Sequence, residues 1–494
     1  MKVRLICCAV AAAMLLCGCQ TGRESQNIPE DPPAVEQPEQ ESPPSDDNVE
    51  EEEKEEESPF PPAPPVCELD FTETESFPLP FEDELLVIGG ELYLSTEQAL
   101  YDYDTMWQLL EENYPFFEAI KRELGIDWEE VKADYRQVLE GHASYGYIGQ
   151  AYFLQTIDGC LREFQSVGHL FLVTVQSRVN LLDLFKNSES AHTQNKFELV
   201  SNPKSELSYR YFNKHIQQLP PWGYDGSNSD SEEGERVNID KLNPISQHLF
   251  TGYVGEGIPY LRIASFSQWD DAAQARLEDF FSNISQKEHL IIDVRGNGGG
   301  DTGGWMLGIV PFLAQAQKKY EYIQLWAAKS GSLNLILEPE FDKSRGYITR
   351  YTDDSWQEEF PYISPDMVTG MDIFLKVPMM VFTGADVPDR FHGKIWVLVD
   401  KNCYSATEAL VCFCKETGFA TLVGTNTGGS GKGAAPYYMA LPYSGLIVAY
   451  ETYLSFNLDG TCNGTSGTVP DIVSEEGRGA LETCLMAING EVCL

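Results

Sequence analysis

The chain has 494 residues and carries 34 Lys and Arg residues against 77 Asp and Glu residues, which gives a formal net charge of −43 at pH 7. This length allows two or three domains with ample hydrophobic cores. The negative charge argues against nucleic acids and anionic lipid headgroups as partners, because both repel an acidic surface.

The first 18 residues are predicted to be a lipoprotein signal peptide. Lys2 and Arg4 precede an apolar run that ends in Leu16-Cys17-Gly18-Cys19. This run is too short to span a bilayer comfortably, and an ordinary secretory signal would end in a small-residue site. The ending resembles a bacterial lipoprotein site, in which Cys19 receives the lipid and becomes the mature N-terminus. We therefore expect an extracytoplasmic protein that is lipid-anchored to the bacterial cell membrane.

Residues 19–66 are predicted to be a lipidated, acidic, proline-rich tether. Residues 20–66 hold 11 of the 28 prolines, 15 acidic residues and two basic residues. Such a composition buries too little apolar surface to fold. A flexible coil of this length reaches roughly 40 Å, which would hold the folded body away from the membrane. The tether carries only part of the net charge, so the body is acidic as well.

Eight cysteines remain when the signal peptide and Cys19 are set aside. Their spacing does not form a metal-binding cluster, and Cys412 and Cys414 should point to different faces of a predicted helix. We therefore expect no metal and no cofactor. Cys67 and Cys493 can pair only if the two ends of the body meet.

Residues 67–168 are predicted to form an N-terminal helical domain. Trp107, Leu110 and Tyr114 recur at helical spacing, and Asp127 is a candidate helix N-cap. Residues 170–185 alternate like a strand. The polar stretch at about 186–250, which includes the sequence SNSDSEEGE, is predicted to be an insertion or a lid.

Residues 169–494 are predicted to form an α/β core. Apolar runs predict strands over 258–263, 290–294 and 396–399, and an amphipathic pattern predicts a helix over 272–284. The sequence predicts neither an internal repeat nor a transmembrane span.

Two glycine-bearing segments predict acyl-transfer chemistry. In the segment LIIDVRGNGGG, a buried strand ends in Gly298, Gly299 and Gly300, where no side chain blocks access to the backbone N–H groups. In the second segment, the strand at 396–399 leads through a turn to Ser405 at the start of a helix, beside free N–H donors and the positive helix end. Either segment alone is typical of an ordinary strand-to-helix turn. Their combination favours a nucleophile with an oxyanion site.

These motifs resemble the C-terminal-processing (tail-specific) serine peptidases and their tricorn-core-like relatives. The similarity runs from about residue 101 to residue 473 and is carried by YLRIASF, LIIDVRGNGGG, YSATE, VGTNTGG, LPYSGL and GTVPDI. The resemblance implies a crotonase-like spiral core in which Ser405 is the nucleophile. It also implies an oxyanion hole formed by Gly298, Gly299 and Ala406.

The family activates its serine in two ways. Processing peptidases use a lysine in a segment like T-x-G-K-G, but here Ser430 stands at the expected place and Lys432 lies two residues further on. Tricorn-like members use a histidine before an apolar strand, which His169 matches. We favour His169 as the general base, because an imidazole suits proton transfer near neutral pH and a lysine would first need heavy desolvation. Lys432, among glycines, is expected to stay hydrated and protonated, and it remains the alternative base.

The third member of the triad is not assigned. Tricorn-like relatives place an acid shortly before G-x-x-P-D, and this chain has no acid there. The imidazole could be held by Asn463, by Thr465, by Ser466, or by Glu451 from the preceding strand.

Three polar residues of the first glycine motif are assigned to structure. Asp293 and Arg295 would form an ion pair, and Asn297 would stabilise the turn with its amide. The stretch from 170 to 250 lacks a convincing carboxylate-binding glycine loop, so no PDZ domain is assigned.

The sequence therefore predicts a membrane-anchored serine endopeptidase that acts on proteins or peptides through an acyl-enzyme on Ser405. The alternative is a catalytically impaired lipoprotein of the same fold that binds peptides or serves as a scaffold. An acyl-CoA enzyme is a weaker third reading, because export separates the protein from cytosolic thioesters. The oligomeric state is not predicted.

Overall fold

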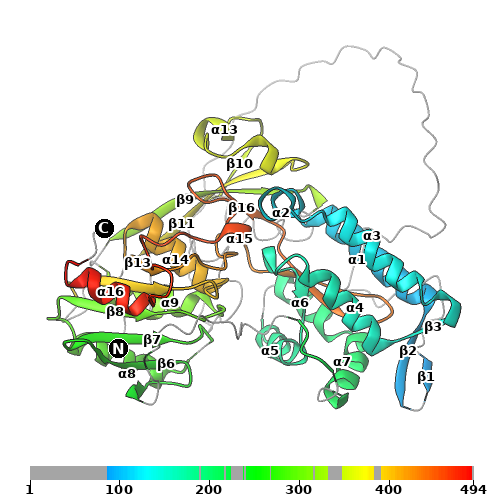
Figure 1. Ribbon diagram of the computed structural model, residues 1–494, viewed down its shortest axis with the longest axis horizontal. Coiled ribbons are helices and arrows are strands. Elements are labelled where there is room, and N and C mark those ends of the chain that lie inside the picture. Colours follow the sequence, from blue (N-terminus) through cyan, green and yellow to red (C-terminus); the bar gives the residue numbers. More distant parts are fainter. Residues whose placement is uncertain are drawn as a thin grey trace, which may run out of the picture.

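The computed structural model describes residues 86–88, 90–188, 191–215, 219–223, 237, 241–267, 269–314, 318–331, 348–382 and 391–491. Figure 1 shows two lobes with a separate sheet above them. The signal peptide, Cys19, the tether, Cys67 and Cys493 lie outside the described residues. Within the described ranges, none of the helices has the length and apolar character needed to cross a membrane.

The first lobe is mostly helical and is built around one apolar core. Trp107 and Tyr114 are fully buried in it, as their helical spacing predicts, and Asp127 caps α3 (Trp128–Glu140) by accepting from the N–H groups of Glu129 and Glu130. The elements of this lobe are β1 (Leu86–Ile88), β2 (Glu91–Ser95), α1 (Thr96–Asn113), α2 (Phe117–Leu124), α3 (Trp128–Glu140), β3 (Tyr147–Gly149), α4 (Gln150–Arg162), α5 (Val175–Phe185), α6 (Ala191–Ser201) and α7 (Pro203–His215).

The strand predicted over 170–185 is wrong for most of its length. Only Phe171–Leu172 forms a strand, β4, and Thr174 then caps α5 by accepting a hydrogen bond from the N–H of Ser177. The interpretation of 186–250 as a polar insertion is also wrong for its first part, because α6 and α7 place Val200 and Phe212 in the core of the helical lobe. The sequence SNSDSEEGE lies outside the described residues.

The second lobe is organised by a seven-stranded sheet with the strand order β17-β13-β12-β8-β7-β6-β5. The strands from β17 to β7 run parallel, and β6 and β5 continue the sheet in antiparallel fashion. Its elements are β5 (Asn243–Pro244), β6 (Leu249–Val254), β7 (Ile258–Ile263), α8 (Asp271–Asn283), β8 (His289–Asp293), α9 (Thr302–Gly308), α10 (Val310–Leu313), β12 (Lys394–Val399), α14 (Ala406–Thr417), β13 (Thr421–Gly424), β17 (Ile472–Val473) and α16 (Ala480–Ile488).

Both faces of this sheet are buried, which explains the continuous apolar runs of its strands. Leu290 and Ile292 of β8 face one core, which α8, α9 and α14 complete, whereas Ile291 faces a second core that α16 covers. Cys414 lies in the first of these cores, and Cys412 instead contacts the carboxyl group of Glu408. The two cysteines therefore point to different surroundings, as predicted.

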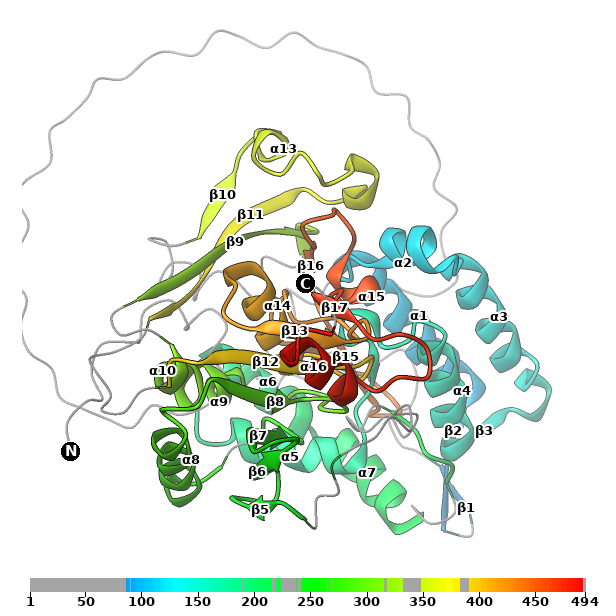
Figure 2. The ribbon, with the colours of Figure 1, turned by 60° about the vertical axis from the view of Figure 1, so that its left-hand side comes forward.

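Two smaller sheets connect the lobes. Strands β10-β11-β9-β16 form the sheet above the lobes, with α13 at its outer end (Figure 2). Strands β14-β15-β4 form the other sheet, in which β4 pairs with β15, more than 270 positions later in the chain. The remaining elements are β9 (Lys319–Ala328), β10 (Thr349–Tyr351), α13 (Trp356–Glu359), β11 (Ile373–Phe382), β14 (Tyr437–Ala440), β15 (Ile447–Tyr450), β16 (Leu454–Ser455) and α15 (Asn463–Ser466).

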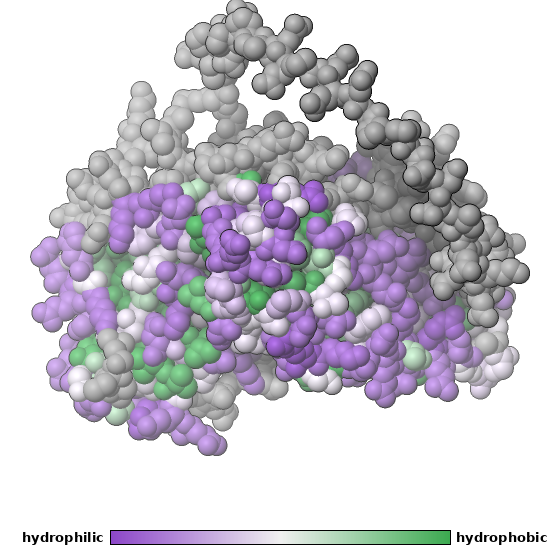
Figure 3. Space-filling model, turned by 90° about the horizontal axis from the view of Figure 1, so that it is seen from above, coloured by the Kyte–Doolittle hydropathy of each residue, from purple (hydrophilic) through white to green (hydrophobic). Residues whose placement is uncertain are grey.

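The α/β fold class with an N-terminal helical region, predicted from the sequence, is confirmed. Hydrophilic residues cover much of the face seen from above, as expected for an acidic chain (Figure 3). The other predicted domain limits and the lack of a PDZ domain stay predictions.

Candidate active site

The turn after β12 presents Ser405 at the start of α14. Ser405 has a positive φ of 56° and a ψ of −122°, and its N–H donates to the carbonyl of Gly429 at 3.1 Å. A residue with a β-carbon adopts such a conformation at a cost of about 1–3 kcal/mol, and such strain is concentrated at functional sites. The strand β12 lies beside β8 in parallel, so this turn and the glycine run after β8 meet at the same edge of the sheet.

His169 reaches Ser405 from the helical lobe. The distance from its Nε2 atom to the Oγ atom of Ser405 is 3.0 Å, and the histidine is 5% exposed. This distance is within hydrogen-bond reach, as a general base for the hydroxyl requires. The two residues are 236 positions apart, and the end of the helical lobe docks against the α/β lobe to bring them together.

Pairing between β4 and β15 places a carboxylate behind the histidine. Phe171 pairs with Ala449 in an antiparallel register, which brings His169 opposite Glu451 when the pairing is extended by two residues. The Nδ1 atom of His169 lies 3.3 Å from the Oε2 atom of Glu451. Of the four candidates that the sequence left open for this contact, Glu451 is the one that makes it.

The Glu451 carboxyl group is enclosed. Its side chain is 1% exposed, and burial raises its pKa, an effect that the hydrogen bond and the charge of His169 partly offset. Gly433 leaves room for the Glu451 carboxyl group, since a β-carbon at position 433 would lie 1.3 Å from Oε1 of Glu451. A glycine is therefore required at position 433 for the carboxylate to reach the histidine.

The other three candidates are engaged elsewhere. The Asn463 amide donates to the carboxyl group of Glu408 at 2.8 Å. The hydroxyls of Thr465 and Ser466 both donate to Glu123 of α2. Glu408 is fully buried, and burial raises the pKa of its carboxyl group. In the sequence, only its place in the YSATE motif marks this residue.

Two backbone N–H groups are candidates for an oxyanion hole. In the part of the chain that the structure describes, no hydrogen bond uses the N–H of Gly298 or the N–H of Ala406. The donor role that the resemblance implied for Gly299 needs correction, because its N–H already donates to Oδ1 of Asn297 at 2.9 Å. Gly299 instead matters for space, since a β-carbon there would lie 2.9 Å from Cβ of Ser405 and 3.1 Å from N of Ala406.

The structural roles predicted for the polar residues of the first motif are confirmed. Arg295 and Asp293 form a buried ion pair, with an N–O distance of 2.7 Å. Burial alone would raise the pKa of the Asp293 carboxyl, but Arg295 and Arg262 hold it well below its usual range. The Asn297 side chain bridges the N–H of Gly299 and the carbonyl of Ile263.

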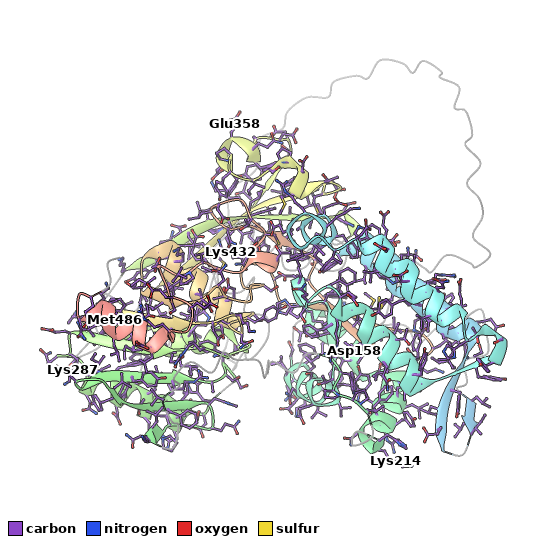
Figure 4. The ribbon with its side chains drawn as sticks, in the orientation of Figure 1. Asp158, Lys214, Lys287, Glu358, Lys432 and Met486 are labelled. Atoms are coloured by element: carbon purple, nitrogen blue, oxygen red, sulfur yellow. The ribbon has the colours of Figure 1, made fainter. Side chains whose placement is uncertain are left out.

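Lys432, the alternative base, is engaged away from the serine and the histidine. Its ammonium group donates to the carboxylate of Glu416 at 2.6 Å and to the carbonyl of Phe456 at 3.0 Å. Among the described residues, no hydrogen bond or ion pair joins Lys432 to Ser405 or His169. The expectation that Lys432 stays hydrated is wrong, because it is 3% exposed near α15 (Figure 4). The glycines around it allow the segment to fold inward. The described residues also contain no cluster of His, Cys, Asp and Glu side chains suited to a metal ion.

Residues 257–474 match the family model described as Peptidase family S41. Over these residues, which make up less than half of its length, the chain is similar to peptidase family S41. The matched region includes Gly298, Ser405 and Glu451, and it begins after His169. The resemblance to these peptidases that the sequence motifs predict is therefore confirmed over the matched residues.

Solved structures with a similar chain trace are distant. A candidate peptidase from Parabacteroides merdae is 18% identical, with a TM-score of 0.45, over 81% of this chain and 98% of that chain. Mature CPAF is 12% identical, with a TM-score of 0.47, over 76% of this chain and 92% of that chain. The photosystem II D1 C-terminal processing protease is 14% identical, with a TM-score of 0.33, over 77% of this chain and 94% of that chain. No curated protein matches the sequence significantly.

Proposed function

We propose that this protein is a serine endopeptidase in which Ser405 is the nucleophile, His169 the general base and Glu451 the residue that orients the histidine. The observation that carries the proposal is the continuous contact from Glu451 through His169 to Ser405, at 3.3 Å and 3.0 Å. Three separate segments of the chain supply these side chains.

The acylation step follows from this arrangement. His169 takes the hydroxyl proton of Ser405 on Nε2 while Oγ attacks the carbonyl carbon of the scissile peptide bond. The N–H groups of Gly298 and Ala406 stabilise the negative charge that develops on the carbonyl oxygen. The C–N bond then breaks, and the protonated His169 gives its proton to the leaving amine.

Deacylation repeats the same steps with water. His169 takes a proton from the water as the water oxygen attacks the acyl carbon, and it then returns the proton to Oγ of Ser405. Glu451 accepts a hydrogen bond from Nδ1–H throughout, which keeps Nε2 free to accept a proton and stabilises the imidazolium ion. The substrate class is a protein or a peptide.

The scaffold alternative rested on the apparent loss of an orienting acid. Glu451 supplies a carboxylate at the required nitrogen, so no observation favours a protein without turnover. Hydrolysis of a protein substrate, such as fluorescein-labelled casein, separates the two functions directly.

The test of the proposed site is active-serine labelling of the mature body with a fluorophosphonate probe. We expect wild-type protein and Ser205→Ala to be labelled, because Ser205 is a buried serine of α7 outside the site. Ser405→Ala should lose all labelling, and His169→Ala should lose most of it, with thermal melts near that of wild type. Labelling that survives Ser405→Ala would refute the assignment.

We also propose that the protein works at the outer face of a bacterial cell membrane, anchored by a lipid on Cys19. The support is the basic start, the short apolar run and the Leu-x-Gly-Cys ending, followed by an acidic, proline-rich spacer. Mass spectrometry of the mature N-terminal peptide should find diacylglycerol on Cys19. A mature protein that begins at another residue and carries no lipid would contradict this proposal.

A further inference from the structure

The loop that carries His169 has an unusual backbone. Gln165, Ser166, Gly168 and His169 all have positive φ values, of 52°, 60°, 54° and 56°. Three of these residues have a β-carbon, and each such residue costs about 1–3 kcal/mol in this conformation. The loop therefore keeps its shape only because neighbouring groups hold it.

Two hydroxyl groups from the nucleophile side of the site hold this loop. The Oγ atom of Ser430 accepts the N–H of Gly168 at 3.1 Å. The Tyr404 hydroxyl accepts the N–H of His169 at 3.1 Å and donates to the carbonyl of Ser166 at 2.7 Å. Ser430 and Tyr404 are each 6% exposed, so water does not compete well for these hydrogen bonds.

Both hydroxyls are linked to Ser405 through the backbone. Tyr404 precedes Ser405 in the chain, and its ring packs on the His169 imidazole with a centroid distance of 4.9 Å. Ser430 follows Gly429, whose carbonyl accepts the N–H of Ser405. Each hydrogen bond therefore ties the position of the base to the position of the nucleophile, independently of any substrate.

The chemistry of Ser430 also bears on the choice of base. The sequence places Ser430 where lysine-type relatives carry their base. A lysine ammonium group has three donors and no acceptor, so it could not accept the N–H of Gly168. A histidine base held in this loop therefore needs an acceptor at position 430, which a serine provides and a lysine does not.

We propose that Ser430 and Tyr404 are positioning residues, which together form a hydroxyl clamp that holds the strained loop 165–169 and so keeps Nε2 of His169 within reach of Ser405. This inference rests on the proposed function, because it takes His169 as the base. It adds that Ser430, which stands where lysine-type relatives are expected to carry their base, supports the histidine base in this chain.

The test compares Ser430→Ala, Ser430→Cys and Tyr404→Phe with wild type in steady-state peptide hydrolysis. We expect kcat to fall about 10- to 100-fold in Ser430→Ala and Tyr404→Phe, with KM changed less than about threefold, because substrate contacts remain while the base is displaced. Ser430→Cys keeps a small side chain with a weak acceptor and no branch at the β-carbon, which the positive φ of 57° at this position disfavours. It should lose less activity than Ser430→Ala. Ser205→Ala is the matched control for removal of a buried serine hydroxyl.

Two further measurements separate positioning from general stability. The rate at which diethyl pyrocarbonate modifies His169 should rise in both single variants, because a released loop exposes the imidazole. The double variant Tyr404→Phe/Ser430→Ala should lose less activity than the product of the two single losses, because both hydroxyls hold one loop.

The outcomes are decisive in both directions. Single variants that keep kcat within twofold of wild type, or that raise KM alone, would overturn the clamp. Failure of all three variants to fold would also overturn it and assign these hydroxyls to overall stability. If His169→Ala stays fully active, the proposed function itself fails; if His169→Ala is inactive and the clamp variants are unaffected, only the clamp fails.

Discussion

Replacement of Glu451 by Gln removes the negative charge behind His169 and changes little else. The side chain keeps its size, so the space above Gly433 stays filled. The Gln amide can also turn its NH₂ group toward Nδ1 of His169, which favours the tautomer with the proton on Nε2. That tautomer cannot accept the proton of Ser405, so Glu451→Gln should lower the chemical rate.

The magnitude follows from the contact distance. An imidazolium ion and a carboxylate about 3.3 Å apart, as Nδ1 of His169 and Oε2 of Glu451 are, interact by about 5 kcal/mol at an effective dielectric constant of about 20. This energy corresponds to roughly 10³- to 10⁴-fold in rate. Because the pair is almost fully buried, solvent screening should reduce the effect little.

The assay is kcat/KM for a fluorogenic peptide, together with the rate of fluorophosphonate labelling. Both should fall by about three orders of magnitude in Glu451→Gln, while a thermal melt shows a folded protein. Glu416→Gln is the matched control, since it neutralises another enclosed carboxylate that pairs with Lys432 and not with His169. A loss smaller than tenfold in folded Glu451→Gln would refute the orienting role.

Three other predictions test the surroundings of the site. Gly299→Ala should slow fluorophosphonate labelling at least tenfold in folded protein, because the new β-carbon would lie 2.9 Å from Cβ of Ser405; an unchanged rate would contradict the packing described. Lys432→Met should lower the free energy of unfolding by about 3–5 kcal/mol, because it leaves Glu416 enclosed without its partner. Fluorophosphonate labelling per folded molecule should not change. The double variant Lys432→Met/Glu416→Gln should recover stability in urea titrations. Burial raises the pKa of the Asp102 carboxyl to about 6, so the folded protein retains a proton that the unfolded chain releases near pH 4. The free energy of unfolding should therefore fall as the pH rises from about 4 to about 6. The urea midpoints of Asp102→Asn should lack this part of the pH dependence, and parallel curves for the two proteins would contradict the role of Asp102.

The parts of the site that depend on local sequence were predictable. A buried strand, a turn and a helix start surround Ser405, and each has a local pattern that β12 and α14 confirm. The ion pair of Asp293 and Arg295 and the turn amide of Asn297 were also correct, because these residues lie within four positions of one another.

The parts that depend on distant pairing were not predictable in full. Glu451 was one of four candidates for the histidine contact, and only the register of β4 with β15 distinguishes it. The hydroxyls of Ser430 and Tyr404 contact a loop more than 230 positions away, and no local pattern marks them.

Two predictions failed for identifiable physical reasons. The alternation of Phe171 and Val173 suggested a long strand, but the cap at Thr174 starts α5 and ends it. The glycines around Lys432 suggested a solvated loop, whereas the loop folds inward and pairs the lysine with Glu416.

The central claim is that peptide hydrolysis proceeds through a covalent intermediate on Ser405. Rapid acid quenching of the mature body during turnover of an activated acyl ester, followed by digestion and mass spectrometry, tests it most directly. We predict an acyl group on the peptide that contains Ser405, with no such adduct in Ser405→Ala and a strongly reduced amount in His169→Ala. Product release at the wild-type rate without any acylated Ser405, or an adduct on a different residue, would contradict the mechanism.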